Sequence, residues 1–290
     1  MKKTVLAVAA ALLASSAYAD TLVTNANGVQ VDAAGQVQHF TGLLIGDDGK
    51  VVRVLHSGEG TPKAAETIDA QSRTLMPGFI DAHGHVIELG EHALQLDLVG
   101  TSSLADLQQR LRDYAAAHPD AKWILGAGWN QELWPDKKFP TAADLDAVVS
   151  DRPVVLGRVD GHALVANSAA MKAAGVTAQT PTPPGGRIEN GLFVDNAKDL
   201  INKAVPTPSP AELDEAFARA QDILLGFGVT GVGSMSTALG DWEAMKRAGK
   251  GGRLNVRFMV YADELNLLKE VPQPTAWLYD DRLRMVGIKF

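Results

Sequence analysis

The chain has no cysteine among its 290 residues. This absence excludes disulfide bonds, which exported proteins commonly use, so the fold has to rest on a packed core. A chain of this length can bury such a core. The absence also excludes thiolate ligands, so any bound metal would be held by His, Asp, Glu or a modified Lys.

Long hydrophobic runs are absent after the first residues. Near the N-terminus, Lys2-Lys3 precedes an apolar run from Val5 to Ala14, and Ala17-Tyr18-Ala19 has the pattern of a cleavage site. We expect residues 1–19 to be a signal peptide, cleaved before Asp20, and the protein to be exported to the periplasm or secreted. The apolar run is shorter than the ~20 residues that a membrane-spanning helix needs, which disfavours a membrane anchor.

An excess of positive charge is absent too. The chain carries 27 Lys and Arg against 34 Asp and Glu, a formal net charge of −7, and loss of Lys2 and Lys3 with the leader would make it −9. This balance argues against nucleic acid or an anionic membrane as a partner.

The stretch from residue 75 to residue 85, Leu-Met-Pro-Gly-Phe-Ile-Asp-Ala-His-Gly-His, carries the first chemical signal. A Pro-Gly turn precedes a short apolar run that is typical of a strand. Because residues two apart share a face of a strand, we expect Asp81, His83 and His85 to point the same way, with Gly84 leaving room between the imidazoles. Two imidazoles with a carboxylate to orient one of them form half of a divalent metal site. The alternative is a pair of turn histidines without a ligand, and the strand context favours the metal.

Three regions follow from the pattern of strands, turns and helix caps. Residues 20–76 are rich in short strands, with a hairpin whose arms, Thr41–Ile45 and Val51–Leu55, flank a glycine-containing loop. Residues 77–290 contain the His-Gly-His strand and, at about 87–208, an insertion without a regular strand–helix rhythm. Within the insertion we expect helices after the caps Ser103 and Thr141, a helix from Asn167 to Ala174, strands at 123–125 and 153–159, and a loop at 177–190.

A regular rhythm begins at Ser209-Pro210-Ala211-Glu212, which is a strong helix start. Strands are predicted to begin at residues 229, 254 and 284, close to the ~30 residues of one unit of an eightfold β/α barrel. In the last strand Val286, Ile288 and Phe290 alternate with Met285, Gly287 and Lys289. We expect the first set to face helices and the second to face inward, which would place Lys289 at the catalytic end of a barrel; an exposed lysine at a frayed end is the alternative.

The insertion also holds a loop rich in glycine and aromatic residues. Trp129, Gln131 and Trp134 lie in this loop and could line a pocket. A core cluster under a loop explains the two tryptophans equally well.

Taken together, these motifs resemble the amidohydrolase superfamily, and within it the family-3 branch that includes N-substituted formamide deformylases. The matching segments run in order along the chain: 76–85, Trp129-Asn130-Gln131 with Trp134-Pro135, Arg152 to Leu156, Asp160-Gly161-His162-Ala163, Asn167-Ser168, Gly185 to Ile188 with Gly191-Leu192, Gly228 to Val232, and Gly287 to Phe290.

This resemblance implies an α/β fold: a partial (β/α)8, TIM-like barrel with an N-terminal β-sandwich segment and a large insertion after strand one. It implies a divalent metal, most often zinc, with His83 and His85 as ligands and Lys289 as a carbamylated bridging ligand. It makes His162 and Asp160 candidates for substrate binding beside Trp129 and Gln131; for His162, a hydrogen-bonded histidine at a strand end is the alternative. The implied reaction is hydrolysis of an amide-type C–N bond of a small molecule by metal-activated water.

The resemblance also implies residues that this chain does not contain. Further histidine ligands and a catalytic aspartate would lie beyond Phe290, and four barrel strands cannot close. We therefore expect the chain to be the N-terminal part of a longer protein whose C-terminal half is missing. Two alternatives stay open: a truncated, non-catalytic fragment that keeps part of a metal site, and a hydrolase of cyclic amides or imines. Whether one metal or two would bind is also open.

Overall fold

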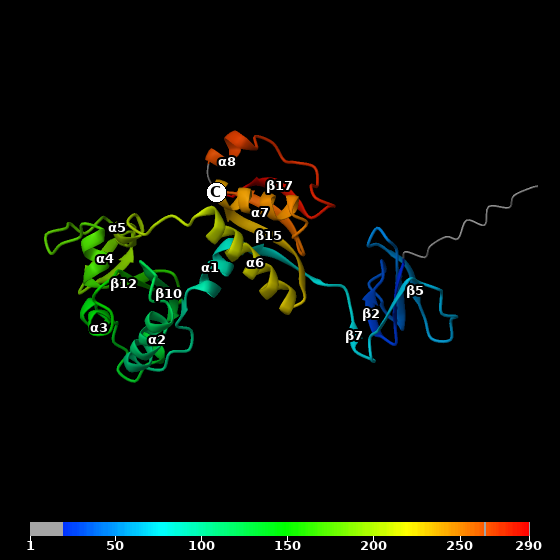
Figure 1. Ribbon diagram of the computed structural model, residues 1–290, viewed down its shortest axis with the longest axis horizontal. Coiled ribbons are helices and arrows are strands. Elements are labelled where there is room, and N and C mark those ends of the chain that lie inside the picture. Colours follow the sequence, from blue (N-terminus) through cyan, green and yellow to red (C-terminus); the bar gives the residue numbers. More distant parts are fainter. Residues whose placement is uncertain (1–19, 264, 290) are drawn as a thin grey trace, which may run out of the picture. The chain divides into compact units, whose positions relative to one another are not determined.

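The computed structural model describes residues 20–263 and 265–289. It divides into two compact units, Met1–Gly78 and Phe79–Phe290 (Figure 1). The predicted signal peptide, residues 1–19, lies outside the described residues. Within the described part of the chain, no helix has both the length and the apolar character needed to cross a membrane.

The first unit consists of short strands in two small sheets, with orders β5-β4-β1-β6 and β3-β2-β7. The strands are β1 (Thr21–Thr24), β2 (Asn27–Val31), β3 (Val37–Phe40), β4 (Gly42–Ile45), β5 (Val51–Leu55), β6 (Glu66–Asp69) and β7 (Thr74–Leu75). The predicted hairpin is confirmed, since β4 and β5 pair antiparallel. The large apolar side chains buried in the first unit are those of Leu22, Phe40 and Leu55.

The second unit is built on a parallel sheet with the order β17-β16-β15-β8. Its strands are β8 (Phe79–Gly84), β15 (Val229–Thr237), β16 (Arg257–Ala262) and β17 (Leu283–Ile288), and its helices are α1 (Val86–Leu94), α6 (Pro210–Gly226), α7 (Leu239–Lys250) and α8 (Leu265–Glu270). The three predicted later strands are therefore confirmed. Helices α6 and α7 lie against this sheet (Figure 1), and Phe217, Trp242 and Met245 from them pack with Phe258 and Val260 of the sheet.

Helix α1 was not predicted, and it belongs with the parallel sheet rather than with the insertion. It packs on α6 so closely that a Cβ atom added at Gly90 would lie 1.8 Å from the carbonyl oxygen of Ala216. The insertion therefore begins after Leu94, and not near residue 87.

The alternation predicted for the last strand is wrong at its start. Leu283 and Met285 are buried on the face of the strand that meets the helices. The sequence analysis assigned Val286 to that face and Met285 to the opposite one. The pairing of β16 with β17 shifts register between Met285 and Gly287, and this irregularity exchanges the two faces. Ile288 consequently packs against the helix side as predicted. Phe290 lies outside the described residues.

The insertion forms its own mixed sheet with the order β13-β14-β12-β11-β10-β9. Its elements are β9 (Leu96–Asp97), α2 (Leu104–Ala117), β10 (Ile124–Trp129), the short 3₁₀ helix η1 (Gln131–Leu133), α3 (Ala142–Asp146), β11 (Val154–Arg158), β12 (Ala163–Ala166), α4 (Ser168–Ala173), β13 (Gly186–Glu189), β14 (Leu192–Asp195) and α5 (Lys198–Asn202). Both faces of the sheet are covered, since Val154 and Leu156 pack with Leu107 of α2 while Val155 packs with Ile201 of α5.

The caps predicted at Ser103 and Thr141 are confirmed, Asn167 is a third cap, and one predicted loop contains a strand. The side chains of Ser103, Thr141 and Asn167 accept bonds from backbone N–H groups at the starts of α2, α3 and α4. Residues 186–189, expected to be loop, form β13 instead, because Asn190 and Gly191 adopt positive φ angles of 49° and 87° and close a tight hairpin with β14.

Candidate functional site

His83 and His85 lie together at the carboxyl end of β8. His83 is within the strand, and His85 is the residue that precedes α1. Their ring centroids are 5.7 Å apart, the ring planes are tilted by 44°, and both residues are exposed. Rings at this spacing can be ligands of one metal ion.

Lys289 follows β17 and reaches His83 from the other edge of the sheet. Its Nζ atom lies 3.3 Å from Nε2 of His83, although the two residues are 206 positions apart in sequence. Neighbouring strands are ~4.8 Å apart, and β15 and β16 lie between β8 and β17. The contact therefore requires a curved sheet, with both side chains on its concave face.

Asp81 contacts the backbone of the His-Gly-His motif. Its carboxylate accepts a hydrogen bond from the backbone N–H of His83 at 2.9 Å. The pairing of β8 with β15 is irregular between Asp81 and Gly84, so the strict alternation assumed from the sequence does not hold. The carboxylate beside an imidazole is that of Glu88, whose Oε2 atom lies 3.6 Å from Nδ1 of His85.

A small acidic cavity of about 260 Å³ lies at the carboxyl ends of β8 and β15. His85 lines it together with the carboxylates of Glu88, Glu91, Asp241 and Asp263. Burial, and then the neighbouring charges of Asp241 and Glu88, raises the pKa of Glu91 above its ordinary value of 4.5. Across residues 20–263 and 265–289, no group of three or more His, Cys, Asp or Glu side chains is arranged as a metal site.

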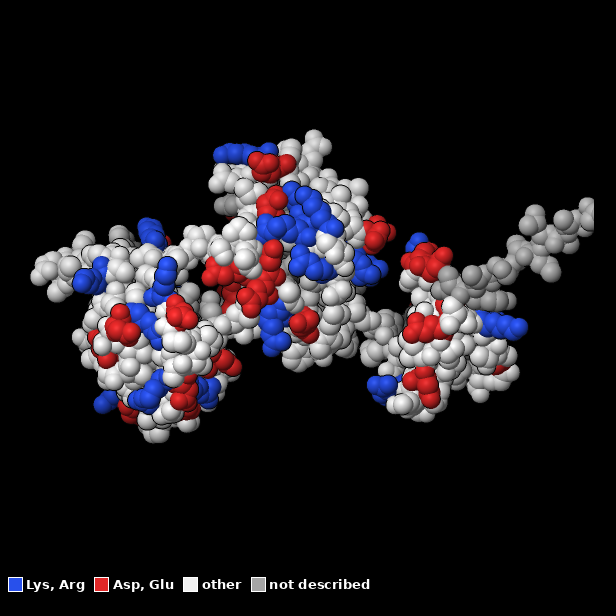
Figure 2. Space-filling view, in the orientation of Figure 1, with Lys and Arg blue, Asp and Glu red and all other residues white. Residues whose placement is uncertain are grey.

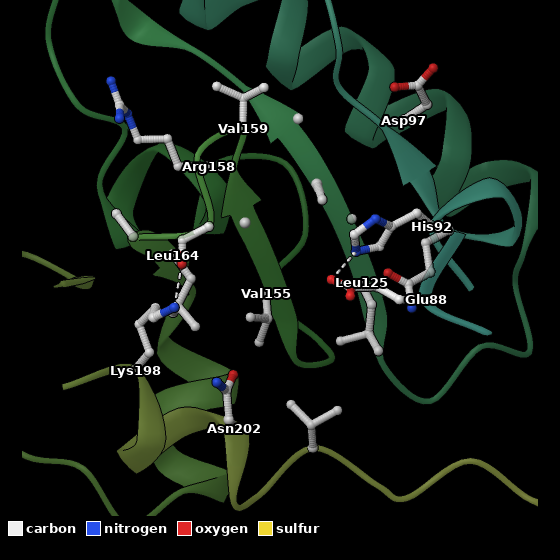
Figure 3. Close-up of a pocket in the computed structure, with 18 of the residues that line it drawn as sticks. Glu88, His92, Asp97, Leu125, Val155, Arg158, Val159, Leu164, Lys198 and Asn202 are labelled. Carbon is white, nitrogen blue, oxygen red and sulfur yellow. Dashed lines mark hydrogen bonds and ion pairs between the residues drawn. The ribbon is translucent and has the colours of Figure 1, made fainter. Parts of the chain in front are cut away.

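A larger groove, of about 820 Å³, lies between α1 and the sheet of the insertion (Figure 3). Small residues of β10 and β11, such as Gly126 and Gly157, contribute to its lining. Glu88 and His92 of α1 lie on one side in Figure 3, and Arg158 and Lys198 lie on the other. The groove is therefore walled by both acidic and basic side chains.

The structure brings Asp160 to this groove and places His162 beside it. Asp160 lines the groove, pairs with Arg158, and accepts a bond from the backbone N–H of His162 at 3.0 Å. His162 directly follows the lining residue Gly161, and its Nδ1 atom lies 2.9 Å from Oδ1 of Asp195.

Trp129 and Gln131 do not line the groove as the structure describes it. Trp129 is 0% exposed, and its indole N–H donates to the carbonyl of Leu156 at 2.8 Å. Gln131 is 2% exposed, and its side-chain oxygen accepts from Nε of Arg158 at 2.9 Å. Trp129 therefore occupies the place of a core side chain, which is the alternative considered for it, and Gln131 reaches the groove only through Arg158.

Three residues of this region were missed by the sequence analysis. Glu88 could have been found from its spacing of three positions from His85 on a helix, which brings side chains together. Asp195 offered no comparable signal, because its partner His162 is distant in sequence. Arg158 offered none either, because its partner Asp160 follows it by two residues in a turn.

The chain is similar to several known proteins. The amidohydrolase family model matches residues 66–288. YtcJ of Bacillus subtilis is 37% identical over 210 residues, which cover 68% of this chain and 40% of YtcJ. N-substituted formamide deformylase of Arthrobacter pascens is 29% identical over 254 residues, which cover 81% of this chain and 46% of the deformylase.

The fold has a counterpart among solved structures. An uncharacterized metal-dependent hydrolase from Pyrococcus horikoshii OT3 superposes with a TM-score of 0.70 at 24% identity, over 93% of this chain and 54% of the hydrolase. The chain spans 40% of YtcJ and 46% of the deformylase, so it matches less than half the length of each of these two curated relatives. Since the family model covers more than half of this chain, the protein belongs to the amidohydrolase family, in its family-3 branch.

Proposed function

We propose that the chain carries part of the active site of a metal-dependent hydrolase that cleaves amide-type C–N bonds of small molecules. The observation that carries the proposal is the approach of Lys289 Nζ to within 3.3 Å of His83 Nε2, beside His85. It gathers the three residues that the family resemblance assigns to the metal, from the two edge strands of one sheet.

The proposal includes the architecture around this site. We assign residues 77–290 to an incomplete (β/α)8 barrel and residues 20–76 to its β-sandwich segment. The parallel order of β8, β15, β16 and β17, their helices on one face, and the curvature required by the Lys289 contact support the barrel. The place of the site at the carboxyl ends of these strands is where barrel enzymes keep their chemistry.

The metal proposed here is zinc, held by His83 and His85, with Lys289 as a carbamylated bridging ligand. The donor types fit, since imidazole suits zinc, and a lysine would offer ligand oxygens once carbamylated, although its ammonium form has donors only. Catalytic zinc sites use three protein ligands, so the two histidines would need carbamylated Lys289 or a further ligand to complete the set. When bound, the metal would lower the pKa of a water molecule and polarise the substrate carbonyl.

The remaining residues would bind and orient the substrate. Asp160 and His162 lie at the groove, and Gln131 holds the guanidinium of Arg158 there. N-substituted formamides, named in the deformylase relative, are the substrates we would test first. Because of the leader-like residues 1–19, we also propose that the protein is exported.

Zinc retention tests the site. The protein would be loaded with Zn²⁺ and dialysed, and its zinc content would be measured by mass spectrometry. We expect the unaltered protein to retain zinc and His83→Ala and His85→Ala to bind it at least about tenfold more weakly. Loss of a residue that only orients a ligand already weakens metal binding by about 10–100-fold, so loss of a ligand should have at least this effect. His118→Ala is the matched control, because His118 bonds the carbonyl of Tyr114 at the end of α2, in the insertion.

Amine release from N-benzylformamide by a longer, zinc-loaded form that carries the further ligands and the aspartate implied by the family resemblance tests the reaction. We expect release to disappear in the His83→Ala, His85→Ala double variant and to persist in His118→Ala. Zinc content equal in the double variant and the unaltered protein would reject the metal assignment.

A further inference from the structure

The turn that carries His162 is fixed by contacts from several elements. Asp160 pairs with Arg158 and accepts the backbone N–H of His162 at 3.0 Å. Lys198, from α5, donates to the carbonyl of Gly161. These contacts hold the backbone that leads into His162, directly after Gly161, which lines the groove.

Asp195, at the end of β14, contacts His162 twice. Its backbone N–H donates to the carbonyl of His162 at 2.8 Å, and its Oδ1 atom lies 2.9 Å from Nδ1 of the imidazole. Asp195 also has a φ angle of +49°, a left-handed conformation that is uncommon for residues other than glycine. The chain thus adopts an unfavourable backbone conformation at the residue that meets the imidazole.

A carboxylate at Nδ1 decides which ring nitrogen of a neutral histidine carries the proton. The carboxylate is an acceptor only, so Nδ1 has to be the protonated nitrogen and Nε2 is left as an acceptor. Within residues 20–263 and 265–289, Nε2 of His162 has no hydrogen-bond partner, and the side chain is 74% exposed. An exposed ion pair contributes little to stability, so stability alone gives no reason for a strained residue here.

We propose that Asp195 is a positioning residue that holds His162 with a bare Nε2, so that this nitrogen accepts a hydrogen bond from the N–H of a secondary amide in the groove. The ligand class rests on the proposed function, since an amide-type substrate supplies such a donor. The positioning role rests on the geometry of His162 and Asp195 alone, and it can be tested without any hydrolysis.

The tautomer of His162 can be read from the side-chain nitrogen resonances of ¹⁵N-labelled protein at about pH 8, above the ordinary imidazole pKa. Absence of the signals in His162→Gln assigns them among the 7 histidines. We expect mainly the form protonated at Nδ1. In Asp195→Gly, which keeps the left-handed backbone and removes the acceptor, the ratio of this form to the other should fall on the order of fivefold, as for loss of a charge-assisted bond.

Asn190→Gly is the matched control, because Asn190 also has a left-handed φ angle, +49°, in the neighbouring hairpin. It should leave the His162 ratio unchanged. If Asp195→Gly does not fold, Asp195→Asn gives the same comparison with a weaker acceptor. A His162 protonated mainly at Nε2 in the unaltered protein, or a ratio insensitive to Asp195, overturns the positioning role.

The ligand class is tested by adding N-benzylformamide or its N-methylated analogue, which lacks the N–H. We expect the Nε2 resonance of His162 to move with the first compound and to stay with the second. Movement with both, or with neither, overturns the assignment of a secondary amide. A failure to bind zinc or to release amine would change neither the tautomer measurement nor the resonance shift of His162. The proposed function and the positioning role of Asp195 can therefore be rejected independently.

Discussion

Glu91 is the acid of the small cavity whose protonation depends most clearly on its surroundings. Burial raises its pKa above the ordinary 4.5, and the charges of Asp241 and Glu88 add to the effect. The folded state therefore binds the proton more tightly than the unfolded state. Below pH 4.5 the Glu91 carboxyl is largely protonated in both states, so it does not lower the free energy of unfolding. As the pH rises from there through the folded pKa, the ionised carboxylate increasingly destabilises the folded state.

Glu91→Gln should remove this pH-dependent cost. Measured by thermal unfolding in EDTA from pH 4 upward, the melting temperature of the variant should exceed that of the unaltered protein increasingly with pH. Glu215→Gln, the same change at an exposed position of α6, should show no such trend. A difference that is constant across the pH range would contradict the role given to Glu91.

Single residues show where local sequence stops being informative. The motif Asn167-Ser168 marked Asn167, and a helix starting there was predicted correctly, with Asn167 as its N-cap. Its larger role was not: the buried amide accepts from the N–H groups of Val154 and Ala170 and donates to the carbonyls of Val149 and Arg152. A side chain that satisfies four groups from three segments depends on tertiary contacts, which a motif does not contain.

At the scale of elements, the predicted helices and strands are mostly those with strong local signals. The capping box of Ser209 and Glu212 starts α6 as expected, and Thr141 starts α3 with the same motif. Helix α1 has no such signal, since His85 precedes it without a side-chain cap bond. It is stabilised by packing on α6, and that contact spans more than a hundred residues of sequence.

Gly90→Ala tests this packing. The added Cβ atom would lie 1.8 Å from the carbonyl oxygen of Ala216, so α1 and α6 have to separate. We expect a loss of about 1–3 kcal/mol in the free energy of unfolding, as for overpacked cores, measured by urea denaturation.

Gly226→Ala is the helical control for this change. A Cβ atom at Gly226, the last residue of α6, meets no atom within 4 Å, so the substitution should not destabilise the protein and should stabilise α6 by less than the roughly 0.5–1 kcal/mol of a helix interior. Equal effects of the two substitutions would show that helix propensity, and not the approach of α1 to α6, determines the outcome.

For the whole molecule, the exposed apolar residues at one end of the parallel sheet are a liability. Phe79 and Ile80 of the edge strand β8 are 55% and 70% exposed, and Phe227 is 77% exposed. Edge strands with apolar side chains favour pairing between molecules. The charged surface does not offset this, since basic side chains of the second unit lie beside acidic ones in Figure 2.

We expect the protein to associate as its concentration rises in sedimentation velocity experiments. Ile80→Lys should shift the distribution toward the monomer, because it charges the exposed edge. Leu133→Lys is the control, since Leu133 is 63% exposed but lies in the insertion. A monomer at every concentration, or an equal effect of both variants, would contradict this assignment.

The site as a whole was predictable in its residue types and not in its surroundings. The spacing of His83 and His85 placed these two residues together, whereas Lys289 was joined to them by the family resemblance and not by the strand pattern alone; its Nζ atom lies 3.3 Å from Nε2 of His83. The groove was not predictable, because it is formed between α1 and a sheet whose strands are distant in sequence.

The contact between Lys289 and His83 also bears on the order in which the molecule folds. The two residues are 206 positions apart in the chain, and two further strands lie between theirs in the sheet. Because a contact between residues so distant in sequence is slow to form, we expect it to follow the pairing of the intervening strands. A metal bound there would stabilise the sheet after its strands have paired, and would not stabilise the chain before that point.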